Sequence, residues 1–215
     1  MKFIAAFSTG KDSILALHRM VEAGHEPAGL LIMYNTGAER SWFHGADHKL
    51  IERISESLGI PVYYGASDGE DYIEVFEEQL VKAVENGVEA CVFGDIDIEN
   101  HREWDEARCR AAGIKAVLPL WQESREALVR ETIAAGYTCI IKCLHKEQLP
   151  ESFLGKALSS QVLDEMENYG IDLCGENGEY HTVVLDGPLF KKKIDYSLGE
   201  ILELQYVTAI EINVE

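Results

Sequence analysis

The chain has 215 residues, 47% of them hydrophobic, which suits one large domain or one domain with a smaller appendage and excludes a disordered protein. Aspartate and glutamate number 38 against 19 lysines and arginines, and the formal charge of −19 repels nucleic acid, so no nucleic-acid partner is expected. A phosphate-bearing ligand meets the same repulsion, so its site must attract phosphate locally or through Mg²⁺.

The chain begins with an apolar run, a polar turn and a helical pattern. Residues 3–7 are predicted to form a short buried strand, and Ile14, Leu17 and Val21 have the spacing of one helix face. Between them lie small and polar residues, namely Ser8, Thr9, Gly10, Lys11, Asp12 and Ser13. Such a turn can bind an anion, because backbone N–H groups, hydroxyl groups, the helix dipole and the Lys11 ammonium attract negative charge. A capped turn with a chance lysine is the competing interpretation.

Four further apolar runs follow, alternating with helical patterns. The predicted strands cover residues 28–33, 61–64, 90–93 and 115–118. This alternation predicts right-handed crossovers and a doubly wound, parallel, five-stranded sheet in an α/β domain over residues 1–120. The polar and aromatic loop 34–45 leaves the carboxyl end of a strand, the usual ligand side, and contains His44. A surface histidine without a role is the alternative.

The pattern changes after Trp121. Helices are predicted at residues 125–135 and 158–169, and strands at 137–144, 183–185 and 202–214. We expect a smaller α+β domain over residues 121–215, packed on the carboxyl edge of the sheet.

The five cysteines form no Cys-x-x-Cys pair, and we expect buried structural thiols in a reducing compartment. No secretory signal and no long apolar run is evident in the sequence. We therefore expect a cytoplasmic protein without a membrane partner.

A second motif, residues 174–182, reads Cys-Gly-Glu-Asn-Gly-Glu-Tyr-His-Thr. The carboxylates of Glu176 and Glu179 could bind a cation or an amine, or accept a proton. Their spacing across Asn177-Gly178 can bring both to one side of a hairpin. The same dipeptide is a strong turn signal, so an acidic turn without a role is the competing interpretation.

The N-terminal turn differs from the Walker loop, because Asp12 follows Lys11 and Ala6 stands where an earlier glycine is needed. It resembles the PP-loop, Ser-Gly-Gly-Lys-Asp-Ser, of the ATP pyrophosphatases, which split ATP into AMP and pyrophosphate. Thr9 replaces the usual second glycine, and a threonine is harder to place at positive φ.

The stretches Gly175–Thr182 and Leu185–Phe190 resemble the C-terminal signature of the diphthine–ammonia ligase family. Residues 94–96, 119–121 and 154–156 also match, so with the PP-loop the resemblance covers nearly the whole chain. The sequence departs from the family at Thr9 and at residues 97–100, a segment that we expect near substrate. The implied fold is of the PP-loop, HUP-like type.

The resemblance implies an ATP-dependent, AMP-forming amide ligase. A substrate carboxylate attacks the α-phosphate of ATP to give an acyl-adenylate and pyrophosphate, and ammonia then displaces AMP to form an amide. In the founding enzymes the carboxylate belongs to diphthine, a modified histidine of an elongation factor. The expected cofactors are ATP and Mg²⁺, and the expected partners are ammonia and a carboxylate substrate, with an elongation factor as one candidate carrier.

The resemblance also assigns residues to roles. ATP would be bound by Ser8, Thr9, Gly10, Lys11, Asp12, Ser13, Ile32 and Met33, with the last two facing adenine. Substrate would be bound by His44, Gly94, Asp95, Glu176, Glu179, Tyr180 and Thr182. The expected catalytic residues are Lys11, Asp12, Glu176 and Glu179, with Asp12 also a ligand of Mg²⁺.

Two other functions stay open. A tRNA-modifying PP-loop enzyme needs a basic RNA surface and usually catalytic cysteines, which the charge of −19 and the absence of Cys-x-x-Cys disfavour. A non-catalytic nucleotide-binding protein of the same superfamily would need neither Lys11 nor the acidic motif. The acceptor carboxylate, and the choice between a monomer and a homodimer, are left open.

Overall fold

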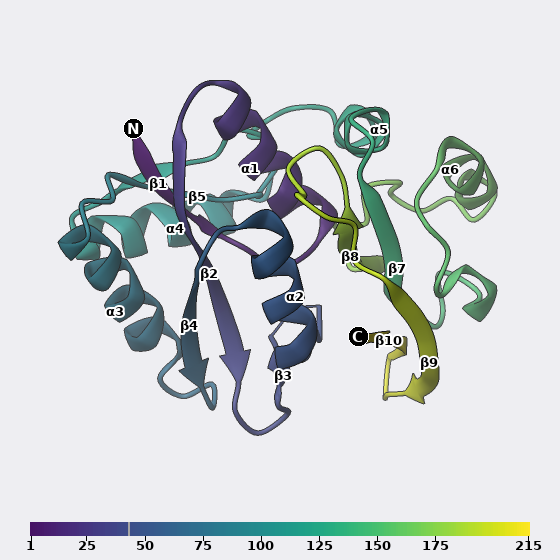
Figure 1. Ribbon diagram of the computed structural model, residues 1–215. Coiled ribbons are helices and arrows are strands. Elements are labelled where there is room, and N and C mark those ends of the chain that lie inside the picture. The colour runs from purple at the N-terminus through teal and green to yellow at the C-terminus, as the bar shows by residue number, and fades with distance from the viewer. Residues whose placement is uncertain (43) are drawn as a thin grey trace.

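The computed structural model describes residues 1–42 and 44–215 and contains two β-sheets (Figure 1). Parallel strands form the larger sheet, namely β1 (Lys2–Ala6), β2 (Glu26–Asn35), β4 (Val62–Ser67), β5 (Ala90–Val92) and β6 (Lys115–Val117). Their order is β4-β2-β1-β5-β6, and the short strand β3 (Arg40–Ser41) pairs antiparallel with the end of β2. The predicted five-stranded parallel sheet is confirmed, and β3 is an addition that the sequence pattern did not indicate. Phe43, in the predicted loop 34–45, lies outside the described residues.

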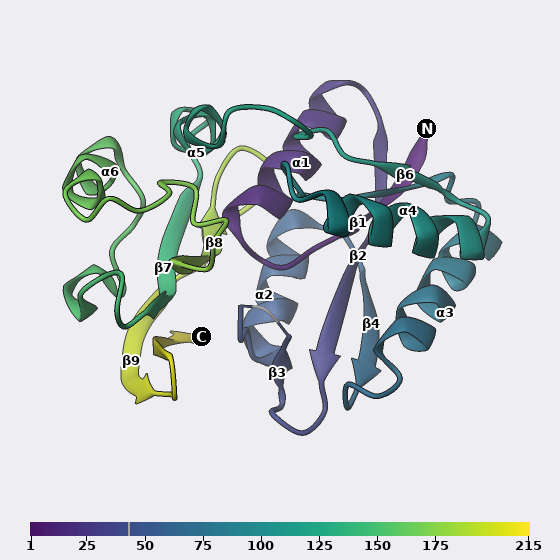
Figure 2. The same ribbon diagram turned by 180° about the vertical axis from the view of Figure 1, so that it is seen from behind.

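Helices cover both faces of this sheet, as the two opposite views in Figures 1 and 2 show. Side chains alternate between the faces, so Phe3 and Ala5 of β1 enter one apolar core while Ile4 enters the other. The first core also takes apolar residues of α1 (Lys11–Glu22) and α2 (His48–Leu58). The second takes those of α3 (Tyr72–Glu85) and α4 (Glu99–Ala112). Helices on both faces complete the doubly wound architecture.

The C-terminal part contains an antiparallel sheet of order β8-β7-β10-β9. Its elements are α5 (Arg125–Ala134), β7 (Thr138–His145), η1 (Glu151–Phe153), α6 (Ser160–Glu167), β8 (Tyr180–Asp186), β9 (Tyr196–Glu203) and β10 (Val207–Val214). The stretch 202–214, expected to be mostly strand, contains the end of β9 and all of β10, which meet at a turn closed by the Leu204 N–H to Val207 carbonyl bond. The edge strand β9 is mostly exposed on both faces, so it lacks the alternating pattern that marks a half-buried strand.

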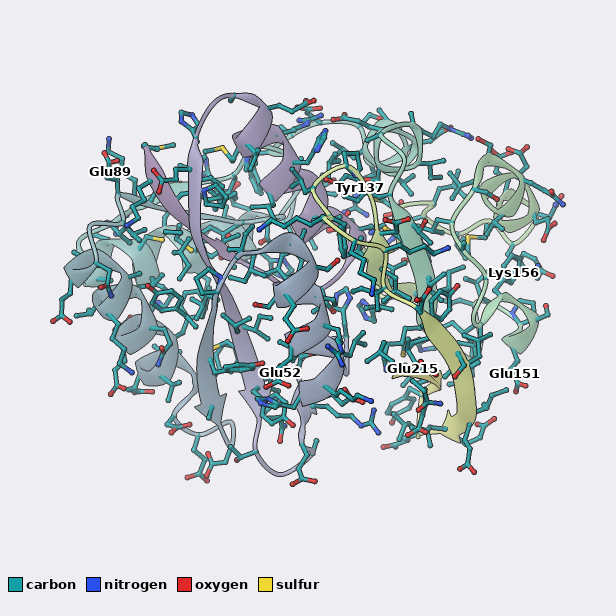
Figure 3. All side chains as sticks on the ribbon, in the orientation of Figure 1. Glu52, Glu89, Tyr137, Glu151, Lys156 and Glu215 are labelled. Carbon is teal, nitrogen blue, oxygen red and sulfur yellow. The ribbon has the colours of Figure 1, made fainter. Side chains whose placement is uncertain are left out.

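The antiparallel sheet packs against the α1 side of the parallel sheet. The first apolar core runs without interruption from β1 and α1 into β7 and β8. Tyr137, labelled at this junction in Figure 3, approaches His18 of α1 with 3.0 Å between Oη and Nδ1. Arg19 of α1 forms ion pairs with Glu123 and Glu131 of the C-terminal part. These contacts hold β8 next to the loop that precedes α1.

All five cysteines are free. Across residues 1–42 and 44–215, the helices are too short or too polar to cross a membrane.

Candidate active site

A cavity of about 540 Å³ lies at the carboxyl ends of the parallel strands. Most residues that the sequence singled out line it, namely Ser8, Lys11, Asp12, Ser13, Ile32, Met33, His44, Gly94, Asp95, Glu176, Tyr180 and Thr182. Thr9, Gly10 and Glu179 were also singled out and lie behind its wall. Residues more than 160 positions apart therefore face one space.

The turn before α1 presents the start of that helix to the cavity. Gly10 is the N-cap residue and offers no side-chain cap, and the Ser13 hydroxyl bonds back to the Gly10 carbonyl at 3.0 Å. Thr9 adopts the left-handed region with φ 73°, so the threonine takes the conformation that a glycine adopts more readily. The first N–H groups of a helix are unpaired within the helix, and the first turn of α1 lines the cavity with Lys11, Asp12 and Ser13.

Two glycines allow other elements to approach this turn closely. A Cβ atom on Gly94, just after β5, would lie 2.9 Å from the backbone of Asp12 and Ser13. A Cβ atom on Gly10 would lie 2.3 Å from the His44 ring. Both positions therefore require glycine for the observed packing.

Lys11 is the cation of the cavity wall. Its side chain is buried, with Nζ 2.6 Å from Asp12 Oδ2 and 5.6 Å from the centre of the Tyr180 ring. Burial disfavours the charged form, but negative groups nearby, Asp12 first among them, outweigh that effect and raise the pKa of Lys11 well above its usual value. The ammonium is therefore charged and close to the helix start.

Strand β8 contacts the turn before α1 from the other end of the chain. The Val184 N–H donates to the Thr9 carbonyl at 2.9 Å, and the Lys11 N–H donates to the Thr182 hydroxyl at 3.0 Å. The Thr182 carbonyl accepts a hydrogen bond from Nδ1 of His44 at 2.7 Å. The first motif, the loop after β2 and the second motif thus meet at Thr182.

His44 and His181 lie together beside the turn, with ring centroids 4.9 Å apart. Burial, with a smaller effect from His181, lowers the pKa of His44 to about 3, and burial lowers the pKa of His181 as well. Both rings are therefore neutral at pH 7. Because Nδ1 of His44 donates to the Thr182 carbonyl, its Nε2 carries a lone pair and can accept a hydrogen bond.

The two glutamates of the second motif have different surroundings. Glu176 faces the cavity, and burial together with the Asp12 carboxylate raises its pKa to about 7. Glu179 points into its own loop, where its carboxylate accepts hydrogen bonds from the N–H groups of Asp172 and Asn177 and from the Asn177 side chain. The expectation that both carboxylates share one side of a hairpin is therefore wrong, because three backbone and side-chain donors draw Glu179 inward.

Asp12, Cys174 and Glu176 form a cluster that joins the two motifs. One ligand atom from each lies within 4.8 Å of the others, and the Cys174 thiol is 3.6 Å from Asp12 Oδ1. Burial raises the pKa of Cys174, so the thiol stays protonated and donates to Asp12. The two carboxylates offer oxygen ligands of the kind that Mg²⁺ prefers.

Arg125, at the start of α5, holds the acidic loop in place. Its guanidinium forms hydrogen bonds with Asp97 at 2.6 and 2.7 Å, and with Asp172 at 2.6 Å and Asn177 at 3.2 Å. Two-pronged contacts of this kind fix geometry as well as charge. The segment 97–100 is therefore tied through Asp97 to the loop that carries Glu176.

The sequence prediction missed one end of the cavity. It is lined by aromatic and acidic residues from the segments that follow β3 and β5 and from two helices, namely Trp42, Tyr72, Phe76, Phe93, His101, Trp104 and Asp105. Within α4 the positions 101, 104 and 105 have the spacing of one helix face, which is the signal that could have indicated them. Tyr72 and Phe76 of α3 have the same spacing, but helical spacing alone does not separate a core face from a cavity wall.

Two family models match the chain. The diphthamide synthase N-terminal domain matches residues 1–116, and the diphthamide synthase C-terminal domain matches residues 124–211. The protein named diphthine–ammonia ligase from Danio rerio is 30% identical over 220 residues, covering 90% of this chain and 86% of that protein. The protein of the same name from Homo sapiens is 29% identical over 228 residues, covering 94% and 85%.

More remote matches have names that refer to tRNA. A tRNA-specific 2-thiouridylase from Saccharopolyspora erythraea is 27% identical over 221 residues, covering 93% of this chain and 59% of that protein. The solved structure of a predicted subunit of tRNA methyltransferase from Methanocaldococcus jannaschii has a TM-score of 0.46 and 15% identity, covering 90% of this chain and 100% of that one.

Proposed function

Because the chain belongs to the diphthamide synthase family, we propose that it is an ATP-dependent, AMP-forming amide ligase of the diphthine–ammonia ligase type. The observation that carries the proposal is the cluster of Asp12, Cys174 and Glu176, which joins the phosphate-binding turn to the acidic motif inside one cavity. Residues 1–120 would bind the nucleotide and residues 121–215 would supply most of the acceptor site.

The chemical character of ATP matches that of the residues that line the cavity. The triphosphate is anionic and the adenine is a flat aromatic ring, while the cavity is lined by Lys11 and the start of α1 and also by a group of aromatic side chains. The N–H groups of the turn and the Lys11 ammonium would stabilise the charge that develops on the leaving pyrophosphate. Adenine would then lie beside Ile32 and Met33 of β2, close to the aromatic end.

The residues present fit Mg²⁺. Asp12 would hold the ion through a carboxylate oxygen, while the protonated Cys174 thiol is a poor ligand for it. When bound, Mg²⁺ would neutralise charge on the phosphate oxygens.

The reaction would proceed in two steps. A carboxylate oxygen of the acceptor attacks the α-phosphorus, the bond to the bridging oxygen breaks, and pyrophosphate leaves with the electron pair. Ammonia then attacks the acyl carbon, AMP leaves, and the nitrogen loses a proton. Glu176 is poised to accept that proton, because its pKa of about 7 lies near working pH. His44, Gly94, Asp95, Tyr180 and Thr182 would position the acceptor, and Glu179 would hold the loop that carries Glu176.

The tRNA-modifying alternative is less well supported. Binding to RNA requires a positively charged surface, whereas this chain has a net charge of −19. A purely nucleotide-binding role does not explain why the half-buried carboxylate of Glu176 lies beside Asp12 in the cavity. Both alternatives are weaker than the ligase.

The experiment that tests the proposal combines nucleotide and amide analysis. The full chain is incubated with ATP, MgCl₂, ¹⁵N-ammonium and a panel of carboxylate acceptors that includes an elongation factor bearing diphthine. AMP, pyrophosphate and one ¹⁵N-labelled amide in equal amounts are expected. ADP as the main product, or AMP release without any labelled amide across the panel, would contradict an amide ligase.

A further inference from the structure

The aromatic end of the cavity is a continuous row of rings. Trp42 and Tyr72 are 5.7 Å apart between ring centroids, Tyr72 and Trp104 are 6.2 Å apart, and Trp104 and Phe76 are 4.9 Å apart. Such rings offer a purine both stacking and edge contacts. Stacking accepts any base, so it does not by itself distinguish adenine from other purines.

Asp105 is the buried carboxyl group at this end. It is 4% exposed and lines the cavity, and its Oδ2 atom has no hydrogen-bond partner among the described residues. A buried polar atom without a partner is costly unless a ligand or water supplies one. The atom is therefore available to a bound molecule.

The charged groups around Asp105 favour its neutral form. Burial, with added repulsion from Asp95, raises the pKa of Asp105 to about 9. The other titratable neighbours come from three elements, namely Tyr72 of α3, Cys91 of β5, and Glu106 and Cys109 of α4. Asp95 lies within hydrogen-bonding reach of Asp105 and also contacts His101, with 3.0 Å between Asp95 Oδ1 and His101 Nδ1. A proton shared with Asp95 relieves this repulsion, and we take it to lie on Oδ1 of Asp105, so that Oδ2, the atom without a partner, acts as the acceptor.

Two backbone carbonyl groups of β2 beside the cavity already accept hydrogen bonds from other parts of the chain. On the edge that extends past β1, the Leu31 carbonyl already accepts from the Phe7 N–H at 2.8 Å, and the Met33 carbonyl accepts from the Trp42 N–H at 3.2 Å. A base lying against Ile32 and Met33 would therefore meet carbonyl groups that each already accept one hydrogen bond. Among the described residues that line the cavity, Asp105 provides a buried side-chain oxygen that has no partner at all.

We propose that Asp105 selects the nucleobase, its Oδ2 accepting a hydrogen bond from the exocyclic 6-amino group of adenine. The proposal rests on the proposed function, since it takes ATP as the ligand of this cavity. A 6-oxo purine would place a carbonyl oxygen against an acceptor and leave both without a donor. Sites built around one hydrogen bond reject an analogue that cannot make it far more strongly than sites that use shape alone.

Calorimetry on the full chain with MgCl₂ and without acceptor tests this with three nucleotides: ATP, inosine triphosphate, and purine riboside triphosphate, which carries hydrogen at position 6. The wild-type protein should bind ATP at least about 100-fold more tightly than inosine triphosphate. Asp105→Asn can turn its amide to donate to the 6-oxo group, so this preference should fall at least about tenfold while purine riboside triphosphate binds as before. Glu103→Gln, an exposed change on the same helix, is the control and should leave the preference intact.

The outcomes separate this inference from the proposed function. An unchanged ATP preference in Asp105→Asn, with wild-type melting temperature, overturns the role of Asp105 and leaves the ligase intact. A wild-type protein that binds both nucleotides equally also overturns it. Absence of any ATP binding by the wild type would instead refute the proposed function. An Asp105→Asn protein that loses all three nucleotides with an unchanged melting temperature would show a role in shaping the pocket and would contradict base selection.

Discussion

The hydroxyl group of Thr182 accepts a hydrogen bond from the backbone N–H of Lys11 at 3.0 Å, across 171 positions of sequence. This N–H belongs to the first turn of α1, where backbone donors have no partner within the helix. The carbonyl of Thr182 also accepts a hydrogen bond from Nδ1 of His44. The C-terminal sheet thus contacts the turn before α1 and helps to fix its shape.

Thr182→Val keeps the shape of the side chain and removes that acceptor. We expect the free energy of unfolding to fall by about 1–3 kcal/mol, because the buried Lys11 N–H loses its partner. Turnover should fall as well, since Lys11 would be held less firmly. Chemical denaturation and initial rates measure the two effects. Thr138→Val, at the start of β7, is the matched control, and an equal effect there would argue against a specific role for Thr182.

Lys11→Ala removes the charged group beside the helix start. We expect turnover to fall by about 100- to 1000-fold, the scale for loss of one donor that stabilises a developing anion. Binding of ATP should weaken less, because the N–H groups of the turn remain. Initial rates and calorimetry provide the comparison, with Lys146→Ala as a control that removes an ammonium paired with Glu203 outside the cavity. Wild-type turnover in the Lys11 variant would exclude the assigned phosphate site.

The local sequence pattern was sufficient to predict those parts of the cavity that come from one continuous segment. The turn at residues 8–13 follows a strand and starts a helix, and that order alone placed Lys11 and Asp12 at the ligand edge. Thr9 was the doubtful position, and one hydrogen bond from Val184 of β8 to its carbonyl helps to hold it at positive φ. A contact of this kind joins distant segments and leaves no local pattern.

The directions in which side chains point could not be predicted from the sequence. The spacing of Glu176 and Glu179 allowed both to face the cavity, and only the donors at Asp172 and Asn177 decide that Glu179 turns inward. The aromatic residues of the cavity were not predicted for a related reason. Trp104 lies on a helix that looked polar throughout, and it meets Tyr72 only after α3 and α4 pack together.

Arg125→Met tests the clamp on the acidic loop. The change keeps most of the stem and removes the hydrogen bonds to Asp97, Asp172 and Asn177. We expect the KM for the acceptor to rise and kcat to fall, because Glu176 would be positioned less well, while calorimetry shows ATP binding within about threefold of wild type. Arg130→Met removes exposed ion pairs on the same helix and should change neither constant. Equal kinetics in both variants would refute a positioning role for Arg125.

Glu176→Gln separates proton acceptance from nucleotide binding. The carboxylate form is the base, so the wild-type rate should rise with pH through about 7 and then level off. Glutamine cannot accept the proton, so amide formation should fall about 100-fold and lose this rise, with ATP binding retained. Rates from pH 5.5 to 9 with saturating ATP show the difference. A variant that keeps the wild-type pH profile would assign the titration to another group.

The same residue should leave a signature in stability without any ligand. The pKa of Glu176 is raised in the folded protein from 4.5 to about 7, first by burial and then by Asp12, so the folded state holds a proton that the unfolded chain releases. The stabilisation linked to that proton is complete below about pH 4.5 and is lost as pH rises through about 7. Glu176→Gln does not titrate, so its melting temperature relative to wild type should increase between pH 5 and pH 8. Scanning calorimetry of both proteins measures this difference, in which titrations common to both cancel. A constant difference across that range would mean that Glu176 ionises normally in the folded protein and is already charged at pH 5.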